Sequence, residues 1–356
     1  MRFCHYAING IGLGHLARTI AIARALGIDE HDHLFLTSSP ATDLLEMESL
    51  PYIQFPSDHH LAEKTLALKD KTYSRLLHGI VSATINAYDP HVFVVDTLPT
   101  GSRGELAQLA TCARRSVFIL REQRKPLAPE IAAAINRYTH ILIPHRQGET
   151  PIPAGIDPAK VTFTGPILLR SKEDPPAAKL PIILKPEQKL VGVAFGGGGD
   201  KDFAKLIRWV ERCAADHPNL HFAISIPPLL RERITQPDSE NVTYFEQSPL
   251  ADLWQRFDFV ISAAGYNSTN ELVHFGVPTI LVPLERPLDD QFARARGLAE
   301  QGAARIVSAF DDASLGEAIS FMKDPKSRAR MSEKSQSLLP QNGASIAASV
   351  LTNVAG

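Results

Sequence analysis

The sequence has few cysteines, little net charge and no long apolar run. Its three cysteines, Cys4, Cys112 and Cys213, are scattered and form no CxxC motif. This argues against a disulfide framework or a zinc site and favours a reducing cytoplasm. The formal net charge of -2 does not indicate a nucleic-acid-binding surface. No apolar run approaches the roughly 20 residues of a membrane-spanning helix, and no signal peptide is recognisable. Any membrane contact is therefore expected to be peripheral.

Short apolar runs alternate with helical patterns along all 356 residues, which is enough chain for two domains. The alternation predicts an α/β protein with two Rossmann-like, doubly wound parallel sheets and a cleft between the carboxyl ends of their strands. Predicted helices include Arg103–Cys112, Leu250–Arg256 and Asn267–Phe275. The predicted organisation is an N-terminal domain 1–170, a proline-rich linker 171–188, a C-terminal domain 189–340 and a final helix 341–356.

The first candidate site is a glycine-rich turn that follows the first predicted strand and includes Gly12, Gly14 and His15. Its GxGxGH spacing differs from the GxGxxG of dinucleotide sites, and no acidic residue ends the second predicted strand. A dinucleotide site is therefore only weakly indicated. His15 opens the first predicted helix, where the helix dipole disfavours imidazolium, so a neutral imidazole is available as a base. A helix-capping role is the alternative.

Asp96 follows the predicted strand Val92–Val95, at the sheet edge where ligands of doubly wound proteins bind. If this strand neighbours the first one, Asp96 would orient His15 and stabilise its protonated form. The two residues would then be a general base and its orienting carboxylate. Capping of the following turn is the alternative role for Asp96.

A second glycine run, 196–199, follows the first strand of the second half and contains Gly197 and Gly198. Four glycines before a helix favour a backbone nest for phosphate, and a plain turn is the alternative. No Gly-Lys-Ser/Thr follows, so this is not a Walker A loop. Phe245 closes a later predicted strand, where it could stack on a nucleobase or belong to the core.

The most informative stretch runs from Ser262 to Glu271, where an apolar strand leads through a small-residue turn into a helix. Free N–H groups and the positive end of the helix dipole make such a turn an anion site. Its candidate ligands of a diphosphate are Gly265, Tyr266, Asn267 and Ser268. Glu271 lies one helical turn past Asn267, so we expect it to reach a ribose hydroxyl. Asp290 and Gln291, after the next strand, offer polar groups for a sugar.

Basic residues gather around one predicted strand of the first half, where Arg121 is followed by Glu122. They could hold an anionic acceptor or form a solvated surface. No group of His, Cys and acidic residues has metal-ligand spacing, so no metal is expected. No cofactor is expected either, because a nucleotide-sugar would be a co-substrate.

The order of these motifs, from Gly10 to Val307, resembles glycosyltransferase family 28, the MurG-like transferases of GT-B fold. The resemblance places the nucleotide-sugar in the C-terminal domain and the acceptor in the N-terminal domain, near Gly12, Arg121 and Glu122. It also implies that the last helix packs back on the N-terminal domain. Where the family has two glutamines, this chain has Asp290-Gln291, which is closer to natural-product transferases.

The predicted function is thus a cytoplasmic, inverting, metal-independent glycosyltransferase. Its donor would be a nucleoside-diphosphate sugar, most simply a UDP-sugar, and its unknown acceptor a small molecule, a natural product or a lipid-linked group. His15, oriented by Asp96, would deprotonate the acceptor. Two alternatives stay open. One is a nucleotide-sugar hydrolase or 2-epimerase of the same fold, and the other is a sugar-nucleotide-binding protein without catalysis.

Overall fold

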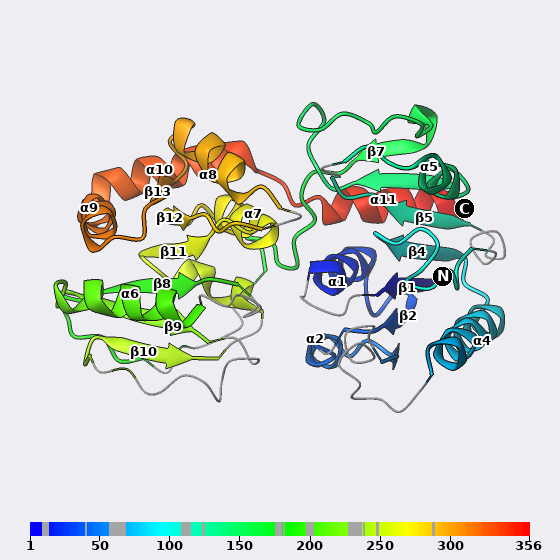
Figure 1. Cartoon of the computed structure of the whole chain (residues 1–356), viewed down its shortest axis with the longest axis horizontal. Helices are drawn as coiled ribbons and strands as arrows, with labels where there is room; N and C mark the ends of the chain where they lie inside the picture. The colour runs from blue at the N-terminus through cyan, green and yellow to red at the C-terminus, as the bar shows by residue number, and fades with distance from the viewer. Residues whose placement is uncertain are drawn as a thin grey trace. The chain divides into compact units, whose positions relative to one another are not determined.

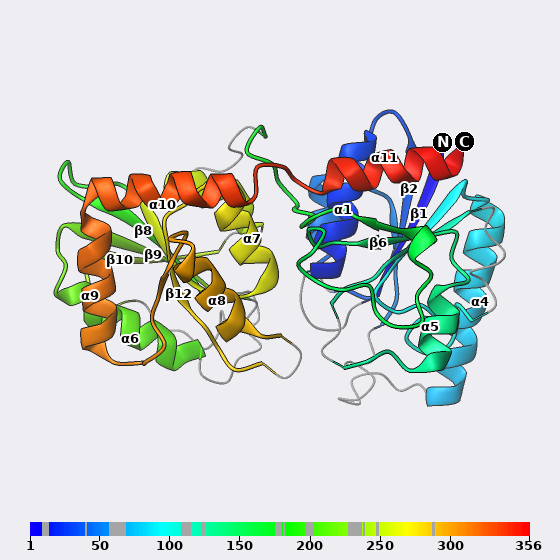
Figure 2. The same cartoon turned by 90° about the horizontal axis from the view of Figure 1, so that it is seen from above.

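The computed structural model contains two compact units (Figures 1 and 2), formed by residues 1–169 with 342–356 and by residues 170–341. It describes residues 1–8, 14–39, 41–56, 69–107, 115–122, 125–174, 180, 182–196, 203–226, 237, 239–246, 249–286 and 289–356. The residues predicted as a linker from 171 onwards group with the second unit. Arg170 bonds to Asp252, and the backbone N–H of Lys172 bonds to His274, which ties the start of this segment to that unit.

The first unit is built on a parallel sheet with the order β3-β2-β1-β4-β5-β6-β7. Buried apolar residues dominate its central strands, as expected when helices cover both faces of a parallel sheet. The strands are β1 (Arg2–Ala7), β2 (Asp32–Thr37), β3 (Tyr52–Gln54), β4 (Val92–Asp96), β5 (Ser116–Ile119), β6 (His140–Ile143) and β7 (Val161–Phe163).

Helices of the first unit pack on both faces of this sheet (Figure 1). They are α1 (Gly14–Leu26), α2 (Asp43–Met47), α4 (Asp70–Tyr88), α5 (Pro129–Ile135) and α11 (Ala344–Ala355), with a 3₁₀ turn, η2, at Pro158–Lys160. The final helix α11 belongs to this unit and lies beside α1 in both views. Ala344, Ala347, Ala348 and Leu351 form its buried face. The small alanines let the two helices approach closely, and Leu351 contributes most of the buried apolar surface.

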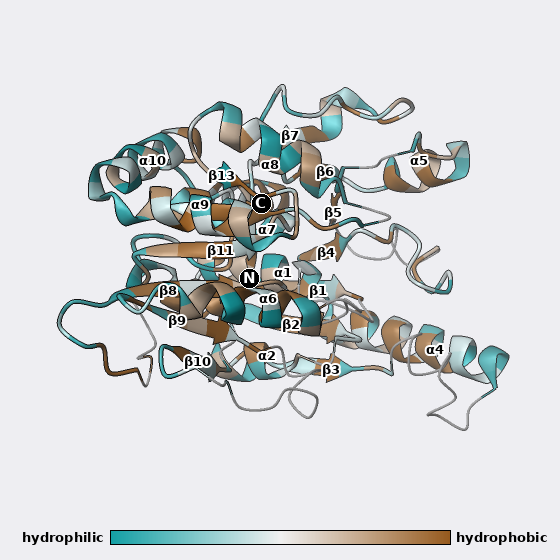
Figure 3. Ribbon diagram, turned by 60° about the vertical axis from the view of Figure 1, so that its left-hand side comes forward, coloured by the Kyte–Doolittle hydropathy of each residue, from teal (hydrophilic) through white to brown (hydrophobic). Residues whose placement is uncertain are grey.

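The second unit contains another parallel sheet, with the order β10-β9-β8-β11-β12-β13. Its strands are hydrophobic along most of their length (Figure 3). They are β8 (Lys189–Ala194), β9 (Leu220–Ser225), β10 (Val242–Phe245), β11 (Phe259–Ala263), β12 (Thr279–Val282) and β13 (Arg305–Ile306). The helices are α6 (Phe203–Ala215), α7 (Tyr266–Phe275), α8 (Gln291–Glu300), α9 (Asp312–Lys323) and α10 (Pro325–Leu338). These two sheets confirm the predicted α/β class with two doubly wound parallel sheets.

Three predicted helices differ from the structure. The segment 103–107 forms bends and turns instead of the start of a helix, and residues 108–112 lie outside the described part of the chain. The cause is Glu105, whose buried carboxylate accepts the backbone N–H groups of Ser102 and Arg103 and so holds them in a turn. The predicted helix Leu250–Arg256 is a 3₁₀ helix, η4. Helix α7 begins at Tyr266, one residue earlier than predicted, because Gly265 is its N-cap.

The two sheets share a topological feature that positions candidate sites. In the first sheet β1 lies between β2 and β4, and in the second β8 lies between β9 and β11. In each unit the chain therefore adds strands on one side of the first strand and later crosses over to add strands on its other side. Ligands of doubly wound proteins bind at this switch point, beyond the carboxyl ends of the two adjacent strands.

Candidate functional site

The switch point of the first unit brings His15 and Asp96 together. Strand β4 pairs with β1 in parallel register, with Tyr6 opposite Val95, and Asp96 is its last residue. Helix α1 begins at Gly14, soon after β1, so His15 lies in its first turn. The His15 Nδ1 atom lies 3.1 Å from Asp96 Oδ1. The sequence analysis predicted this pairing, although Gly12 lies outside the described residues.

Arg18 and Thr97 complete the surroundings of the Asp96 carboxylate, and sequence reasoning had assigned a role to neither. Arg18 donates from Nε to Oδ2 at 2.8 Å and from Nη2 to Oδ1 at 2.9 Å. The Thr97 hydroxyl donates to Oδ1 at 2.5 Å and lies 3.0 Å from Nδ1 of His15. The signal for Arg18 was its spacing, because a residue three positions after His15 lies on the same face of the helix.

Thr97 has a backbone conformation that β-branched residues rarely adopt. Its φ is +73°, in the left-handed region, where such a residue is a genuine outlier. Strained residues of this kind cluster at functional sites. The strain at Thr97 places its hydroxyl between Asp96 and His15.

These contacts favour one tautomer of His15. Thr97 has a single hydroxyl hydrogen, and it is directed at Asp96, so the Thr97 oxygen presents a lone pair to Nδ1. Asp96 Oδ1 is a second acceptor for the same nitrogen. An Nδ1–H group satisfies both, whereas the Arg18 Nη2 atom is the more distant neighbour at 3.3 Å. Nε2 then carries the lone pair, which is the arrangement a general base needs.

Asp96 is ionised although it is fully buried. Burial by itself would raise the pKa of this carboxyl group. The Arg18 guanidinium, together with His15, outweighs that effect and holds the pKa of Asp96 well below its usual range. The carboxylate therefore persists as an acceptor at every pH at which the protein would function.

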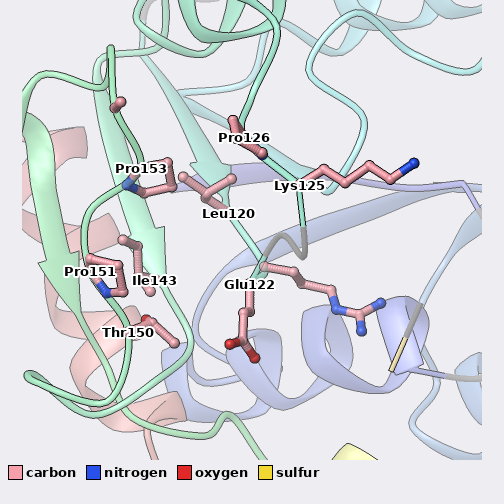
Figure 4. A pocket seen from close by; sticks show the side chains of 10 residues that line it. Leu120, Glu122, Lys125, Pro126, Ile143, Thr150, Pro151 and Pro153 are labelled. Atoms are coloured by element: carbon pink, nitrogen blue, oxygen red, sulfur yellow. The ribbon is translucent and has the colours of Figure 1, made fainter. Parts of the chain in front are cut away.

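A pocket of about 350 Å³ opens near this pair, at the ends of β5 and β6. Residue Ile119 of β5 pairs with Asp96 of β4, and the pocket lining begins at the next residue, Leu120. Apolar side chains gather on one side while Lys125 extends away on the other (Figure 4). The predicted acceptor residues Arg121 and Glu122 belong to the lining, which comprises Leu120, Arg121, Glu122, Lys125, Pro126, Ile143, Thr150, Pro151, Pro153 and Ala154.

The switch point of the second unit carries the predicted diphosphate turn. Strand β11 lies next to β8, and the chain passes from Ala263 through Gly265 into α7. Gly265 is the N-cap, and in the described part of the chain no side chain caps this end. The partly exposed residues Tyr266, Asn267 and Ser268 form the first turn, whose backbone N–H groups have no partner within the helix. This end of α7 can accept an anion. Gly197 and Gly198 lie outside the described residues.

Glu271 lies on α7 and contacts the core of the second unit. Its Oε2 atom accepts a 2.9 Å hydrogen bond from the indole Nε1 of the buried Trp254. The residue is partly exposed as a whole, but its carboxyl group is poorly solvated, and this burial raises its pKa to about 7. The bond from Trp254 and the charge of Arg170 oppose this rise, while Asp252 adds to it. The other carboxyl oxygen, Oε1, can accept from a hydroxyl donor.

Asp290 and Gln291 mark the start of α8. Asp290 accepts the N–H of Ala293 at 3.0 Å as the N-cap, and the buried Gln291 accepts the N–H of Leu284 at 3.0 Å. Arg294, missed by sequence reasoning, connects this region to the α7 turn. It donates to the carbonyl of Ala264 at 2.6 Å, and its guanidinium lies 5.4 Å from the centre of the Tyr266 ring.

Phe245 lies in the core of the second unit. The residue is 9% exposed and packs in a cluster with Trp254, Phe257 and Leu272, among others. The structure thus gives Phe245 the core position that the sequence had left as the alternative. A base-stacking role would need the ring to leave this cluster.

Comparison with known proteins first defines the class of fold. The calicheamicin glycosyltransferase CalG4 superposes with a TM-score of 0.68 at 16% identity, over 99% of this chain and 98% of that one. MurG of Acinetobacter baumannii superposes with a TM-score of 0.62 at 15% identity, over 99% and 100%. The chain therefore has the GT-B fold.

The second half of the sequence is similar to a known family. Residues 193–347 match the family model described as "Glycosyltransferase family 28 C-terminal domain". A relative from Clavibacter sepedonicus is 32% identical over 90 residues. It is described as a UDP-N-acetylglucosamine–N-acetylmuramyl-(pentapeptide) pyrophosphoryl-undecaprenol N-acetylglucosamine transferase. That match spans 24% of this chain and 24% of the relative. The chain has the GT-B fold, and residues 193–347 resemble the C-terminal domain of glycosyltransferase family 28, as the motifs predicted.

Within the described ranges, no three His, Cys, Asp or Glu side chains are grouped so that they could hold a metal ion. None of the helices described above is both long and apolar enough to cross a bilayer.

Proposed function

We propose that this protein is an inverting, metal-independent glycosyltransferase that uses a nucleoside-diphosphate sugar, with UDP as the nucleotide. The observation that carries the proposal is the set of side chains and backbone groups found at the two switch points. One holds a histidine with its orienting carboxylate, and the other holds an open helix N-terminus followed by Glu271. A family 28 C-terminal domain supports the donor half of the proposal, and the curated relative, named as a UDP-sugar transferase, supports the nucleotide.

The first unit supplies the base. The Nε2 lone pair of His15 accepts the proton of an acceptor hydroxyl or amine, and Asp96 stabilises the imidazolium that forms. The activated acceptor attacks the anomeric carbon on the face opposite the diphosphate. One bond forms as the sugar–phosphate bond breaks, and a single displacement inverts the configuration.

The second unit supplies the charge stabilisation that lets the nucleotide leave. Negative charge grows on the departing diphosphate, and the N–H groups of Tyr266, Asn267 and Ser268 are already directed at that position by α7. The helix dipole adds to their effect without a bound cation. Glu271 accepts hydrogen bonds from the ribose, and Asp290 contacts the sugar.

The acceptor binds in the pocket formed around Leu120 and Ile143. Its mixture of apolar side chains with Arg121, Glu122 and Lys125 suits an acceptor with an apolar body and polar groups. We propose a small molecule, a natural product or a lipid-linked group. The cytoplasmic location stays a prediction from cysteine usage.

Turnover of a UDP-sugar in the presence of an acceptor panel tests the proposal. His15→Ala should lower turnover by about 10²–10⁴-fold while calorimetry shows unchanged UDP affinity. His78→Ala, which removes an exposed histidine of α4, is the matched control and should behave as wild type. Equal loss of UDP affinity in His15→Ala would contradict the base role. Free sugar released as fast with no acceptor present would identify a hydrolase or epimerase, and tight binding without any turnover would identify a binding protein.

A further inference from the structure

Arg18 is the one charged side chain in direct contact with both His15 and Asp96 among the described residues. It lies one helical turn after His15 on α1 and is 3% exposed. Its Nε and Nη2 atoms bond to the two oxygens of Asp96 at 2.8 Å and 2.9 Å, and Nη2 also lies 3.3 Å from Nδ1 of His15. A planar guanidinium makes this two-pronged contact, whereas an ammonium group can supply the charge with a less suitable geometry.

We propose that Arg18 is a positioning residue of the catalytic base, which keeps Asp96 as a carboxylate so that His15 rests as a neutral Nδ1–H imidazole. This inference rests on the proposed function only in calling His15 the base. Arg18 touches neither substrate nor the reacting atoms, and it acts through Asp96.

The need for Arg18 follows from the burial of Asp96. A fully buried carboxylate that loses the guanidinium of Arg18 must be neutralised in another way, because an unpaired buried charge is strongly unfavourable. Protonation at either of two sites could do this. Asp96 could bind one itself, or His15 could become imidazolium. In the first case Asp96 no longer requires an Nδ1–H donor, and in the second Nε2 has no lone pair. Either outcome removes the base.

In the described part of the chain, Arg18 supplies a cation to the pair of His15 and Asp96. From β4 the contacting groups are Asp96 and the Thr97 hydroxyl that follows it. Helix α11, which packs on α1, has no ionisable side chain in Ala344–Ala355. Strand β1 contributes His5, whose ring contacts His33 and Phe35. Arg121 and Glu122 follow β5 at the same sheet edge.

Two substitutions of similar size separate the charge of Arg18 from its volume. Arg18→Lys keeps a positive charge with poorer geometry, and Arg18→Gln keeps an N–H donor without the charge. Arg24→Gln is the matched control on the same helix, since Arg24 also pairs with a carboxylate, that of Glu48 at 2.6 Å. Urea unfolding identifies which variants fold, and ¹⁵N-histidine NMR at pH 7.5 then reports the tautomer of His15. Its signals are assigned by their loss in His15→Gln.

The inference predicts a neutral Nδ1–H ring in the wild type, in Arg18→Lys and in Arg24→Gln. In Arg18→Gln we expect a mixed tautomer or imidazolium. With an active donor and acceptor, kcat should fall at least about 100-fold in Arg18→Gln and recover largely in Arg18→Lys, with donor KM unchanged in both. If Arg18→Gln does not fold, loss of the Nδ1–H tautomer in a folded Arg18→Lys would overturn the inference.

The same measurements distinguish failure of this inference from failure of the proposed function. If folded Arg18→Gln and Arg18→Lys both show the wild-type ring, the inference is wrong, whatever turnover is found. If the NMR result is as expected but no nucleotide-sugar is consumed by the wild type, Arg18 sets the state of His15 and the transferase proposal fails.

Discussion

Nucleotide-sugar affinity should depend on pH through Glu271. Burial raises the pKa of this carboxyl group to about 7, so acidification from pH 8 to pH 6 protonates it. A protonated carboxyl has lost acceptor capacity that the ribose hydroxyls require. With binding restricted to the ionised form, the competent fraction falls from about 0.9 to about 0.1, and the apparent Kd rises about tenfold.

The assay is isothermal titration calorimetry with a UDP-sugar at pH 6, 7 and 8. A UDP-sugar is preferable to UDP because a terminal phosphate itself titrates near pH 6. Glu271→Gln keeps the size of the side chain and should bind about 10- to 100-fold more weakly at pH 8, as expected for loss of a hydrogen bond to a charged group. Its Kd should also be independent of pH. Glu300→Gln, which changes an exposed carboxylate at the end of α8, is the matched control and should keep the wild-type dependence.

Two results would refute this reasoning. A wild-type Kd that is constant from pH 8 to pH 6 would mean that the ionised carboxylate is not needed for binding. A Glu271→Gln variant with the wild-type pH dependence would assign that dependence to another group.

Two predictions concern stability. Burial lowers the pKa of His5 and brings that of His33 to about 4, so below pH 6.5 protons bind the unfolded chain first and stability falls as the pH approaches 4. His33→Phe should reduce this slope by up to about 1.4 kcal/mol per pH unit in urea unfolding at pH 5 and 7; an unchanged slope would contradict it. Leu351→Ala, at the buried face of α11, should destabilise the first unit by about 2–5 kcal/mol, whereas the partly exposed Ile346→Ala should cost far less. Equal unfolding midpoints for these two variants would rule out the packing role.

The sequence predicted much of the fold because short apolar runs determine buried parallel strands. It also predicted that Asp96 would orient His15 if their two strands were neighbours, and the structure shows that β1 and β4 are neighbours. It failed at residues 103–107, where a helical pattern is overridden by the Glu105 carboxylate bonding to backbone N–H groups. Side-chain hydrogen bonds of this kind compete with helix formation and leave no periodic signal.

The contacts that refine the site were less accessible to sequence reasoning. Arg18 lies one helical turn after His15, but its bidentate contact with Asp96 depends on how α1 lies against β4. Arg294 contacts the α7 turn from a different helix, 30 residues along the chain. The strained backbone of Thr97 is equally invisible in a sequence, because threonine is not a residue that favours a positive φ.

The most direct test of the proposed function is a calorimetric titration of the protein with UDP, dTDP, GDP and NAD, repeated with Glu271→Ala. The account predicts saturable binding of UDP that is lost in Glu271→Ala and retained in His15→Ala. Binding of NAD alone, or of none of the four, would contradict the glycosyltransferase proposal.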